Sequence, residues 1–275
     1  MRLLKRFGLD VAALVVVVVV FIVPFVFIVA TAMKTRNESA LLQLSWPGEW
    51  EGITNFKAVF DARDNIFLRA MRNSLVITVV SVSLLVVFAS MVGFVLQRRN
   101  DRLAKVVNAF LLAGLIVPPA VVPTIYVLQK IDLFKSLWGL VFIEVAYLLP
   151  FAVLLFRAFV STIPRELDEA AMIDGCSGMR LYFRVIFPLL RPVVITVIVT
   201  SSVIIYNDFQ NPLYFLPGAD NATVQLTLYN FQGQFNTEWN LLFMDVLLIT
   251  VPPLIMFMFF NRKIVSGLTA GAIKG

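Results

Sequence analysis

Residues 164–192 read PRELDEAAMIDGCSGMRLYFRVIFPLLRP and form a polar segment between two long apolar stretches. Pro164 suits the start of a helix, and the acidic residues that follow it complement the positive end of the helix dipole. Gly175 favours a C-terminal turn, because a residue with a Cβ atom would resist that conformation. Ser177 can cap a second short helix that ends before Pro188. The segment therefore predicts two short helices outside the bilayer, joined by a tight turn.

The composition is that of a membrane protein. Apolar residues make up 60% of the 275 residues, against roughly half in a soluble protein, and charged residues only 15%, against about a quarter. A soluble chain of this length could not bury so much apolar surface. The chain has no histidine and a single cysteine, Cys176, which excludes histidine-based catalysis, imidazole–zinc sites and an internal disulfide. We therefore expect no catalytic residue and no metal site.

Six apolar stretches reach about the 20 residues that a bilayer requires, and they predict an all-α protein with six transmembrane helices. The stretches are Val11–Met33, Asn73–Leu96, Val106–Lys130, Trp138–Phe159, Val193–Asn211 and Leu241–Phe260. The first follows a basic start and contains, at residues 30–32, a sequence that could pass for a signal-peptidase site. It is longer than the apolar region of a signal peptide, about 7–15 residues, so we favour an uncleaved helix.

The third apolar stretch contains residues that disturb a helix. These are Gly114, Pro118, Pro119 and Pro123. They predict a kinked membrane helix, since proline removes a backbone hydrogen bond and frees carbonyl groups. Such a helix either lines a translocation path or simply packs with a bend.

The basic residues predict the orientation of the chain. With the N-terminus inside, the inner segments hold 15 Lys and Arg residues and the outer segments 8, as the positive-inside rule requires. Residues 213–240 contain neither Lys nor Arg and must lie outside. Both termini and residues 161–192 then face the cytoplasm. This asymmetry explains the net charge of +6, so we expect contact with membrane lipid and no binding of nucleic acid.

The predicted organisation has a cytoplasmic start, a first membrane helix, an outer loop, a five-helix core and a cytoplasmic tail. Their bounds are 1–10, 11–33, 34–72, 73–260 and 261–275. The core contains a cytoplasmic loop at 161–192 and an outer loop at 213–240. No convincing internal repeat is present.

The polar segment also resembles a known motif. Glu169-Ala-Ala, three residues, Gly175, nine residues and then Val185-Ile-Phe-Pro is similar to the EAA loop of ABC importer permeases. That family ends the motif with Ile-x-Leu-Pro, from which Val185 and Phe187 are conservative departures. Residues 262–275 resemble the tail of the MalG-like carbohydrate permeases. The resemblance covers essentially the whole chain and implies the MetI-like permease fold of a type I ABC importer.

The resemblance assigns contacts with a partner ATPase to two segments. In the EAA loop these residues are Glu169, Ala170, Ala171, Asp174, Gly175, Met179 and Pro188. In the tail they are Ser266, Gly267, Leu268, Thr269, Gly271 and Lys274. The two alanines would leave one helix face flat enough for a partner backbone to approach, and an ionised Glu169 can accept charge-assisted hydrogen bonds. The alternatives are a solvated amphipathic loop and a frayed terminus.

Polar groups at membrane depth are costly and predict a functional site. The candidates for a sugar path are Tyr206, Asn207, Asp208, Gln210 and Glu144. Planar polar side chains with an aromatic ring have suitable chemistry for sugar hydroxyls and ring faces. The alternatives are simple hydration of Asp208 near the outer surface, and hydrogen bonding between helices for Glu144 and for Asp245.

The outer loop at 213–240 is rich in aromatic residues. The resemblance implies that it contacts an extracytoplasmic sugar-binding protein, and the candidates are Tyr214, Tyr229, Phe231 and Trp239. An aromatic belt at the membrane interface is the alternative.

These features together resemble a non-catalytic permease subunit that imports a carbohydrate, of the maltose type or another di- or oligosaccharide. The implied partners are a second homologous permease, two ATPase subunits and a sugar-binding protein, in a bacterial or archaeal cytoplasmic membrane. The chain lacks a glycine-rich phosphate loop, so ATP and Mg²⁺ are expected on the ATPase subunits and no cofactor on this chain. An ion-driven secondary sugar transporter and a membrane-embedded enzyme are the alternatives.

Overall fold

The structure, a computed structural model, describes residues 10–11, 13–218, 221–233 and 236–272, with side chains as far as Phe260. In this part of the chain every regular element is a helix, which confirms the predicted all-α class. The chain divides into two compact units. Unit 1 is Met1–Met71 with Ala222–Pro252, and unit 2 is Arg72–Asn221 with Pro253–Gly275. Two long helices, α5 (Ile66–Arg98) and α14 (Trp239–Ala272), contribute to both units.

Unit 1 contains the N-terminal membrane helix and short helices from both predicted outer loops. Besides parts of α5 and α14, its elements are η1 (Val18–Ile22), α2 (Val23–Ala32), α3 (Arg36–Ser39), α4 (Gly52–Asp61) and η3 (Val224–Asn230). The first helix exposes a continuous run of valines at residues 15–20, as a surface that faces lipid would.

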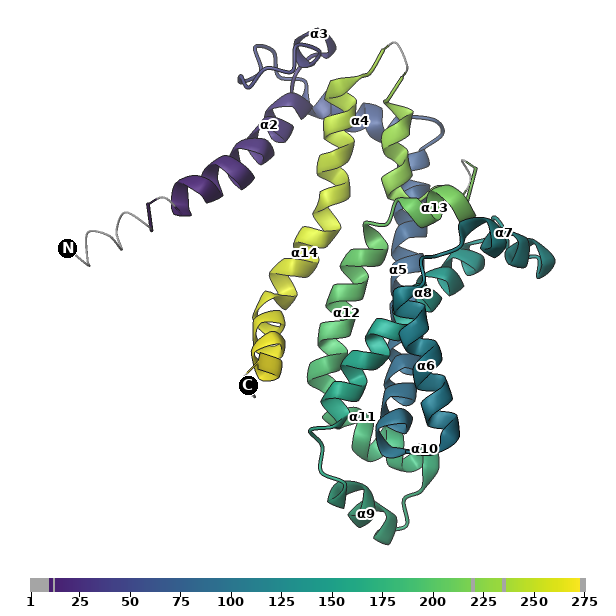
Figure 1. Ribbon diagram of the computed structural model, residues 1–275. Helices are drawn as coiled ribbons and strands as arrows, with labels where there is room; N and C mark the ends of the chain where they lie inside the picture. Colours follow the sequence, from purple (N-terminus) through teal and green to yellow (C-terminus); the bar gives the residue numbers. More distant parts are fainter. Residues whose placement is uncertain (1–9, 12, 219–220, 234–235, 273–275) are drawn as a thin grey trace. The chain divides into compact units, whose positions relative to one another are not determined.

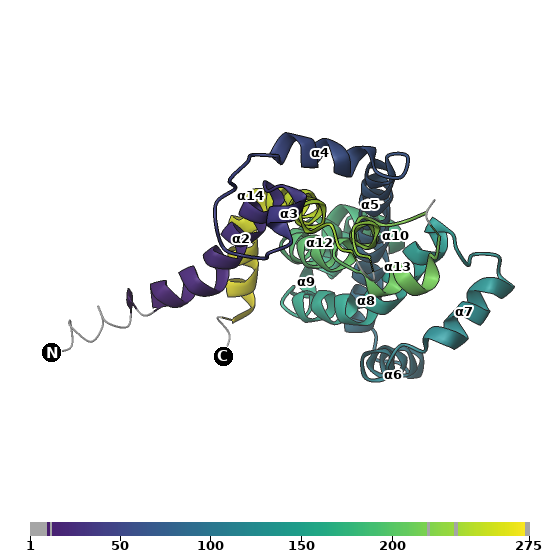
Figure 2. The same cartoon turned by 90° about the horizontal axis from the view of Figure 1, so that it is seen from above.

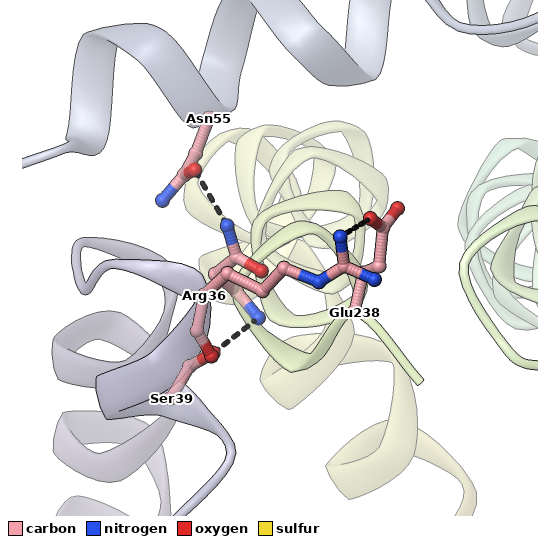
Figure 3. A network of polar contacts seen from close by, with 5 residues as sticks. Arg36, Ser39, Asn55 and Glu238 are labelled. Carbon is pink, nitrogen blue, oxygen red and sulfur yellow. Dashed lines mark hydrogen bonds and ion pairs between the residues drawn. The ribbon is translucent and has the colours of Figure 1, made fainter. Parts of the chain in front are cut away.

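A network of polar contacts joins parts of unit 1 that lie far apart in the sequence (Figure 3). Arg36 Nη1 lies 3.2 Å from Glu238 Oε1, and the backbone N–H of Asn240 donates to Ser39 Oγ at 3.1 Å. The Asn240 side-chain amide donates to Asn55 Oδ1 at 2.7 Å. Asn55 in turn donates to two backbone carbonyl groups at the end of α2. The two loops that the charge count assigns to the same side of the membrane thus fold together.

Unit 2 contains the core of the molecule. Besides parts of α5 and α14, its elements are α6 (Arg102–Ile116), α7 (Val121–Lys130), α8 (Leu137–Val160), α9 (Glu166–Ile173), α10 (Gly178–Leu181), η2 (Tyr182–Ile186), α11 (Phe187–Leu189), α12 (Arg191–Tyr206) and α13 (Gln210–Phe215). Helix α8 packs against α6, α12 and α13. Viewed from above, α6 and α7 lie at the margin of this unit (Figure 2). The central apolar cluster includes the fully buried Leu85, Val153, Phe156, Ile186 and Leu190.

Four described helices are long and apolar enough to cross a membrane. They are Ala13–Ala32, Ile66–Arg98, Leu137–Val160 and Trp239–Phe260. A fifth span results if Gly178–Leu189 and Arg191–Tyr206, which are bent by 76° relative to each other, are counted together. The predicted number of six continuous helices is therefore not reached in the described part of the chain.

The prediction that Val106–Lys130 forms a single kinked membrane helix is wrong. This stretch is divided into α6, with 15 residues, and α7, with 10, both shorter than the roughly 20 residues that cross a bilayer. The break contains Pro118 and Pro119, which cannot donate backbone hydrogen bonds. Val117, directly before them, is extended with ψ of 123°, as a residue that precedes proline prefers. Two adjacent prolines thus end the helix, where one would have bent it.

We predict that Gly93→Ala destabilises unit 2. An added Cβ atom would lie 2.8 Å from the Cβ of Phe156 and 3.1 Å from the backbone nitrogen of Arg157, so α5 and α8 would have to separate. Overpacking of this kind costs roughly 1–3 kcal/mol. Thermal unfolding of the purified chain should show a lower Tm than for Ser83→Ala, a control on an exposed part of α5. Equal Tm values would contradict the close packing.

Candidate functional site

Helix α9 and its C-terminal turn lie at one end of unit 2, opposite the end that carries α13 (Figure 1). The first turn carries Glu166, Asp168 and Glu169, where the helix dipole favours negative charge. Gly175 follows the helix with φ of +78°, and its N–H donates to the carbonyl oxygen of Met172 at 3.0 Å. The predicted glycine turn is therefore present. A Cβ at Gly175 would meet nothing within 4 Å, so glycine is required for its conformation and not for space.

An ion pair fixes α9 to the end of α5. Arg98 Nε lies 2.6 Å from Asp168 Oδ2, and Arg98 Nη2 donates to Asp168 Oδ1 at 3.3 Å. The two side chains are only 14% and 10% exposed. Arg98 Nη2 also donates to the carbonyl oxygen of Ile163 at 3.1 Å, just before α9 begins. One guanidinium group therefore holds both α9 and the segment that leads into it.

Most of the predicted ATPase-contact residues of this loop are exposed, but one is not. The exposed ones are Glu169, Ala170, Asp174, Gly175, Met179 and Pro188. Ala171 is 8% exposed and packs in the apolar core, because it lies one turn after Asp168 on the buried face of α9. The prediction of a flat surface formed by both alanines is therefore wrong, and Ala170 alone faces outward.

Exposed apolar side chains also lie on α9 and α10, and of these only Met179 was among the contact residues predicted from the sequence. Leu167, Met172 and Ile173 are 42%, 58% and 86% exposed, and Met179 is 56% exposed. Large exposed apolar groups gathered on one surface indicate a contact with another protein. The sequence shows these residues, but a helix of eight residues is too short for periodicity to reveal its buried face.

The second half of the EAA-like segment differs from the prediction. Ser177 occupies the N-cap of α10, but its side chain makes no capping hydrogen bond. The helical path does not end before Pro188. It continues through η2 into α11, where Pro188 lies in the first turn. Tyr182 donates its hydroxyl hydrogen to Ser90 Oγ of α5 at 2.5 Å in the core, so this half is also attached to α5.

A cluster of polar side chains joins α8 to the break between α12 and α13. Asn211 Nδ2 donates to Glu144 Oε1 at 3.1 Å, and Glu144 is 3% exposed. Asp208 lies close enough to Glu144 to interact with it electrostatically. Asp208 Oδ1 also accepts the backbone N–H groups of Gln210, at 2.8 Å, and Asn211, at 3.2 Å, so it caps α13.

The structure brings together only part of the predicted sugar path. Glu144 and Asp208 lie together, and Asn211, which was not among the candidates, connects them. Tyr206 is 5% exposed in the last turn of α12, whereas Asn207 and Gln210 are exposed. Asp208 and Asn211, which are partly exposed, could bind hydroxyl groups at this position, whereas Glu144 and the ring of Tyr206 are buried behind them.

The residues predicted to contact a binding protein differ in their exposure. Tyr214 and Tyr229 are 41% and 50% exposed, and Trp239 is partly exposed and stacks on Phe243 with ring centroids 6.1 Å apart. Phe231 is only 5% exposed, so its assignment as a contact residue is wrong.

No group of three His, Cys, Asp or Glu side chains in the described residues could hold a metal ion. The buried Asp245 accepts a hydrogen bond from Thr227 Oγ1 at 2.9 Å, across two elements of unit 1. The interpretation of Asp245 as a hydrogen-bonding partner between elements is therefore favoured over a role in the sugar path.

The C-terminal tail continues α14 as far as Ala272. Its backbone is thus helical through the residues predicted to contact an ATPase, which are Ser266, Gly267, Leu268, Thr269 and Gly271. Lys274 lies outside the described residues. The role of the tail stays a prediction.

A comparison with protein families shows the family of the chain. The family described as "Binding-protein-dependent transport system inner membrane component" matches residues 86–269, which include α9, its turn and the polar cluster. The chain belongs to this family. Its EAA-like segment is thus found in a permease of the expected class, and the MetI-like fold is confirmed.

Three relatives whose names give a sugar substrate show that the chain belongs to the carbohydrate permeases of this family. It is 30% identical to the melibiose/raffinose/stachyose import permease MelC of Bacillus subtilis, with 92% of this chain and 91% of that protein covered. It is 31% identical to AmyC of Thermoanaerobacterium thermosulfurigenes, a probable permease for starch degradation products, with 94% of both covered. It is also 31% identical to the diacetylchitobiose uptake permease DasC of Streptomyces coelicolor, with 95% of both covered. The chain is therefore a non-catalytic, multi-pass permease of the carbohydrate ABC importers.

Solved structures support the fold. A bacterial ABC transporter that imports the acidic polysaccharide alginate contains a chain that superposes with a TM-score of 0.80 at 15% identity, with 95% of this permease and 98% of that chain covered. A second alginate transporter structure, in complex with a periplasmic protein that carries an alginate pentasaccharide, gives a TM-score of 0.68. At this identity the likeness concerns the fold alone.

We predict that Asp168→Ala loosens α9 without affecting insertion of the permease. Removal of one partner leaves the Arg98 guanidinium without its carboxylate, and breaking a buried pair costs roughly 3 kcal/mol. Hydrogen exchange of the α9 amides should therefore become faster in the purified protein. Glu166→Ala, an exposed acid in the same turn, serves as the control. Unchanged protection of α9 in Asp168→Ala would show that the ion pair does not hold the helix.

Proposed function

We propose that α9 docks on a cytoplasmic ATPase subunit and transmits ATP-driven movement into this permease. The observation that carries the proposal is an exposed face on α9, with Glu169 and apolar neighbours, backed by the buried Arg98–Asp168 pair. The exposed face suits a protein partner, and the ion pair prevents the helix from yielding when it is pushed. A loop that only connected two membrane helices would need neither feature.

The docking chemistry combines charge and apolar contact. Glu169 offers an exposed carboxylate for charge-assisted hydrogen bonds, while Ile173 and Met172 offer apolar surface beside it. Ala170 adds a small side chain on the exposed side. In an interface, burial of these apolar groups would exclude water around the carboxylate and strengthen its hydrogen bonds.

Movement of α9 reaches α5 by two connections. Arg98 at the C-terminal end of α5 holds Asp168, and Ser90, two turns earlier, accepts the hydroxyl hydrogen of Tyr182. The two halves of the EAA-like segment are thus attached to the same membrane helix. Force applied to this segment would tilt or shift α5 as one body.

In the transport cycle that follows, two ATPase subunits bind ATP and Mg²⁺ and close. Their closure acts on the docking helices of this permease and of a second homologous permease, and opens the path outward. Hydrolysis resets the path inward, which is an alternating-access mechanism. In this scheme the C-terminal tail, from Ser266 to Lys274, reaches the interface between the ATPase subunits.

The proposed topology has both termini and α9 in the cytoplasm. The distribution of Lys and Arg supports it. The loops joined by the Arg36–Glu238 pair then lie outside, where Tyr214, Tyr229 and Trp239 are available to a sugar-binding protein. The alginate transporter solved with its periplasmic protein is a precedent for such a complex.

We propose a di- or oligosaccharide as the substrate. The relatives take up melibiose, raffinose and stachyose, starch degradation products, or diacetylchitobiose. In this permease the Glu144–Asn211–Asp208 cluster offers acceptors and a donor for sugar hydroxyls at membrane depth.

The acidic character of that cluster favours one alternative, an ion-driven secondary sugar transporter. Two carboxylates near each other could couple the movement of a cation or proton to that of a sugar. Uptake into vesicles that persists without ATP and follows an ion gradient would support this alternative and contradict the ATP-driven importer.

We predict that Glu169→Lys uncouples transport while the permease still inserts. Reversal of the charge removes a charge-assisted hydrogen bond worth about 1.5–3 kcal/mol, so docking should weaken by roughly tenfold or more. Co-purification of the ATPase and ATP-dependent sugar uptake in proteoliposomes should both fall.

The control for this experiment is Glu166→Lys, which makes the same charge change at an exposed position three residues earlier on α9. It should retain most of the uptake, because it lies away from the apolar residues at the C-terminal end of the helix. Full uptake by Glu169→Lys would exclude the proposed docking mode.

We also predict that Glu144→Gln lowers sugar uptake but not the amount of folded permease. Glutamine keeps an oxygen that can accept from Asn211 but replaces the second carboxyl oxygen with an NH2 group, so the arrangement of Asp208 and Asn211 for a sugar hydroxyl changes. The KM for uptake should rise, whereas Gln129→Ala, an exposed polar change on α7, should leave it unchanged. A normal KM in Glu144→Gln would remove this cluster from the sugar path.

A further inference from the structure

An apolar groove, here called the apolar slot, lies between α5 and α6. It encloses about 330 Å³. Its lining residues are Met91, Val92, Val95, Leu96, Arg99, Leu103, Ala104 and Val107. Along α5 the slot extends from Met91 to Arg99, a step of eight residues, which corresponds to about 12 Å of helix. Val95 and Leu103 are 44% and 63% exposed, so the slot is open to the surroundings of unit 2.

A second, polar cavity adjoins the slot at the end of α5. This basic pocket encloses about 80 Å³ where α5, α6 and α8 meet, and its polar lining is Arg99, Asn100, Lys105, Asn108 and Arg157. The slot and the pocket share Leu96, Arg99 and Ala104. They therefore form one continuous depression with an apolar arm and a basic end.

The basic pocket has an unbalanced charge. Three cationic side chains line it, and no carboxylate does so. Arg157 is held by neutral partners, since Nε donates to Gln97 Oε1 at 3.1 Å and Nη1 donates to Asn108 Oδ1. These bonds fix the guanidinium group without neutralising it. Arg99 pairs with Asp101, which lies outside the pocket lining.

We propose that the apolar slot and the basic pocket bind one anionic phospholipid of the bilayer. An acyl chain occupies the slot, and the phosphate lies between Arg99, Lys105 and Arg157. Basic pockets between membrane helices attract anionic headgroups in this way. A free anion would leave the slot unused, and a neutral lipid would leave Lys105 and Arg157 without a counter-charge such as Arg99 has in Asp101. The position of α6 at the margin of unit 2 gives a bilayer lipid direct access (Figure 2).

Bound lipid would connect the first turns of α6 to the end of α5 that holds α9. It would thereby stabilise the anchor of the docking helix, and the composition of the membrane would modulate transport. The lipid site itself requires only that this end of α5 lies at a membrane surface, so it is independent of the sugar and of the ATPase.

Native mass spectrometry of the full-length permease in mild detergent tests the proposal. Phosphatidylglycerol should remain bound as one tight copy, and phosphatidylcholine with the same acyl chains should not. Arg99→Ala combined with Lys105→Ala should lower the affinity for phosphatidylglycerol roughly twenty-fivefold, at about fivefold for each charge. Arg102→Ala, an exposed basic residue of the same segment that lines neither cavity, is the matched control.

A second variant tests the apolar arm without changing any charge. Val95→Trp should fill the slot and reduce retention of phosphatidylglycerol, whereas Val87→Trp, at a similarly exposed position earlier on α5, should not. Circular dichroism of each variant checks the fold.

Three results would overturn the proposal. They are equal retention of phosphatidylglycerol and phosphatidylcholine, unchanged retention in the Arg99/Lys105 double variant, and complete displacement of the lipid by glycerol 3-phosphate at equal concentration. The last would identify a site for a small phosphate and not for a lipid.

Discussion

The Arg98–Asp168 ion pair is the contact on which the cytoplasmic end of unit 2 depends. Helix α9 is short, mostly exposed and followed by a glycine with positive φ, so it has little packing of its own. The ion pair and the hydrogen bond to Ile163 compensate for that lack. In the mechanism proposed for this permease, the Arg98–Asp168 pair lets α9 transmit force from an ATPase subunit to α5.

Proline determines how the rest of the unit is built. Pro118 and Pro119 divide one apolar stretch into α6 and α7, and Pro188 lies in the first turn of α11. A bend of 76° follows between the helices around Leu190. The break around Leu190 lets the short helices α10 and α11 lie near the end of α5, where the docking helix also lies, whereas α7 lies toward the end that carries α13 (Figure 1).

Much of this arrangement could be predicted from local sequence. Apolar length, the distribution of charge and the glycine turn at Gly175 are local signals, and the structure agrees with the all-α class and with that turn. Contacts between distant residues could not be predicted, since nothing in the sequence links Arg98 to Asp168. The burial of Ala171 and Phe231 was missed for the same reason, because the buried face of a short element depends on its neighbours.

The turn after α9 contains the chain's one cysteine. Cys176 is partly exposed and directly follows Gly175. A maleimide fluorophore or spin label would therefore attach at a single position beside the docking face, with no need to replace other thiols. Spectroscopy on the otherwise unaltered polypeptide could then follow this turn through a full cycle of nucleotide turnover.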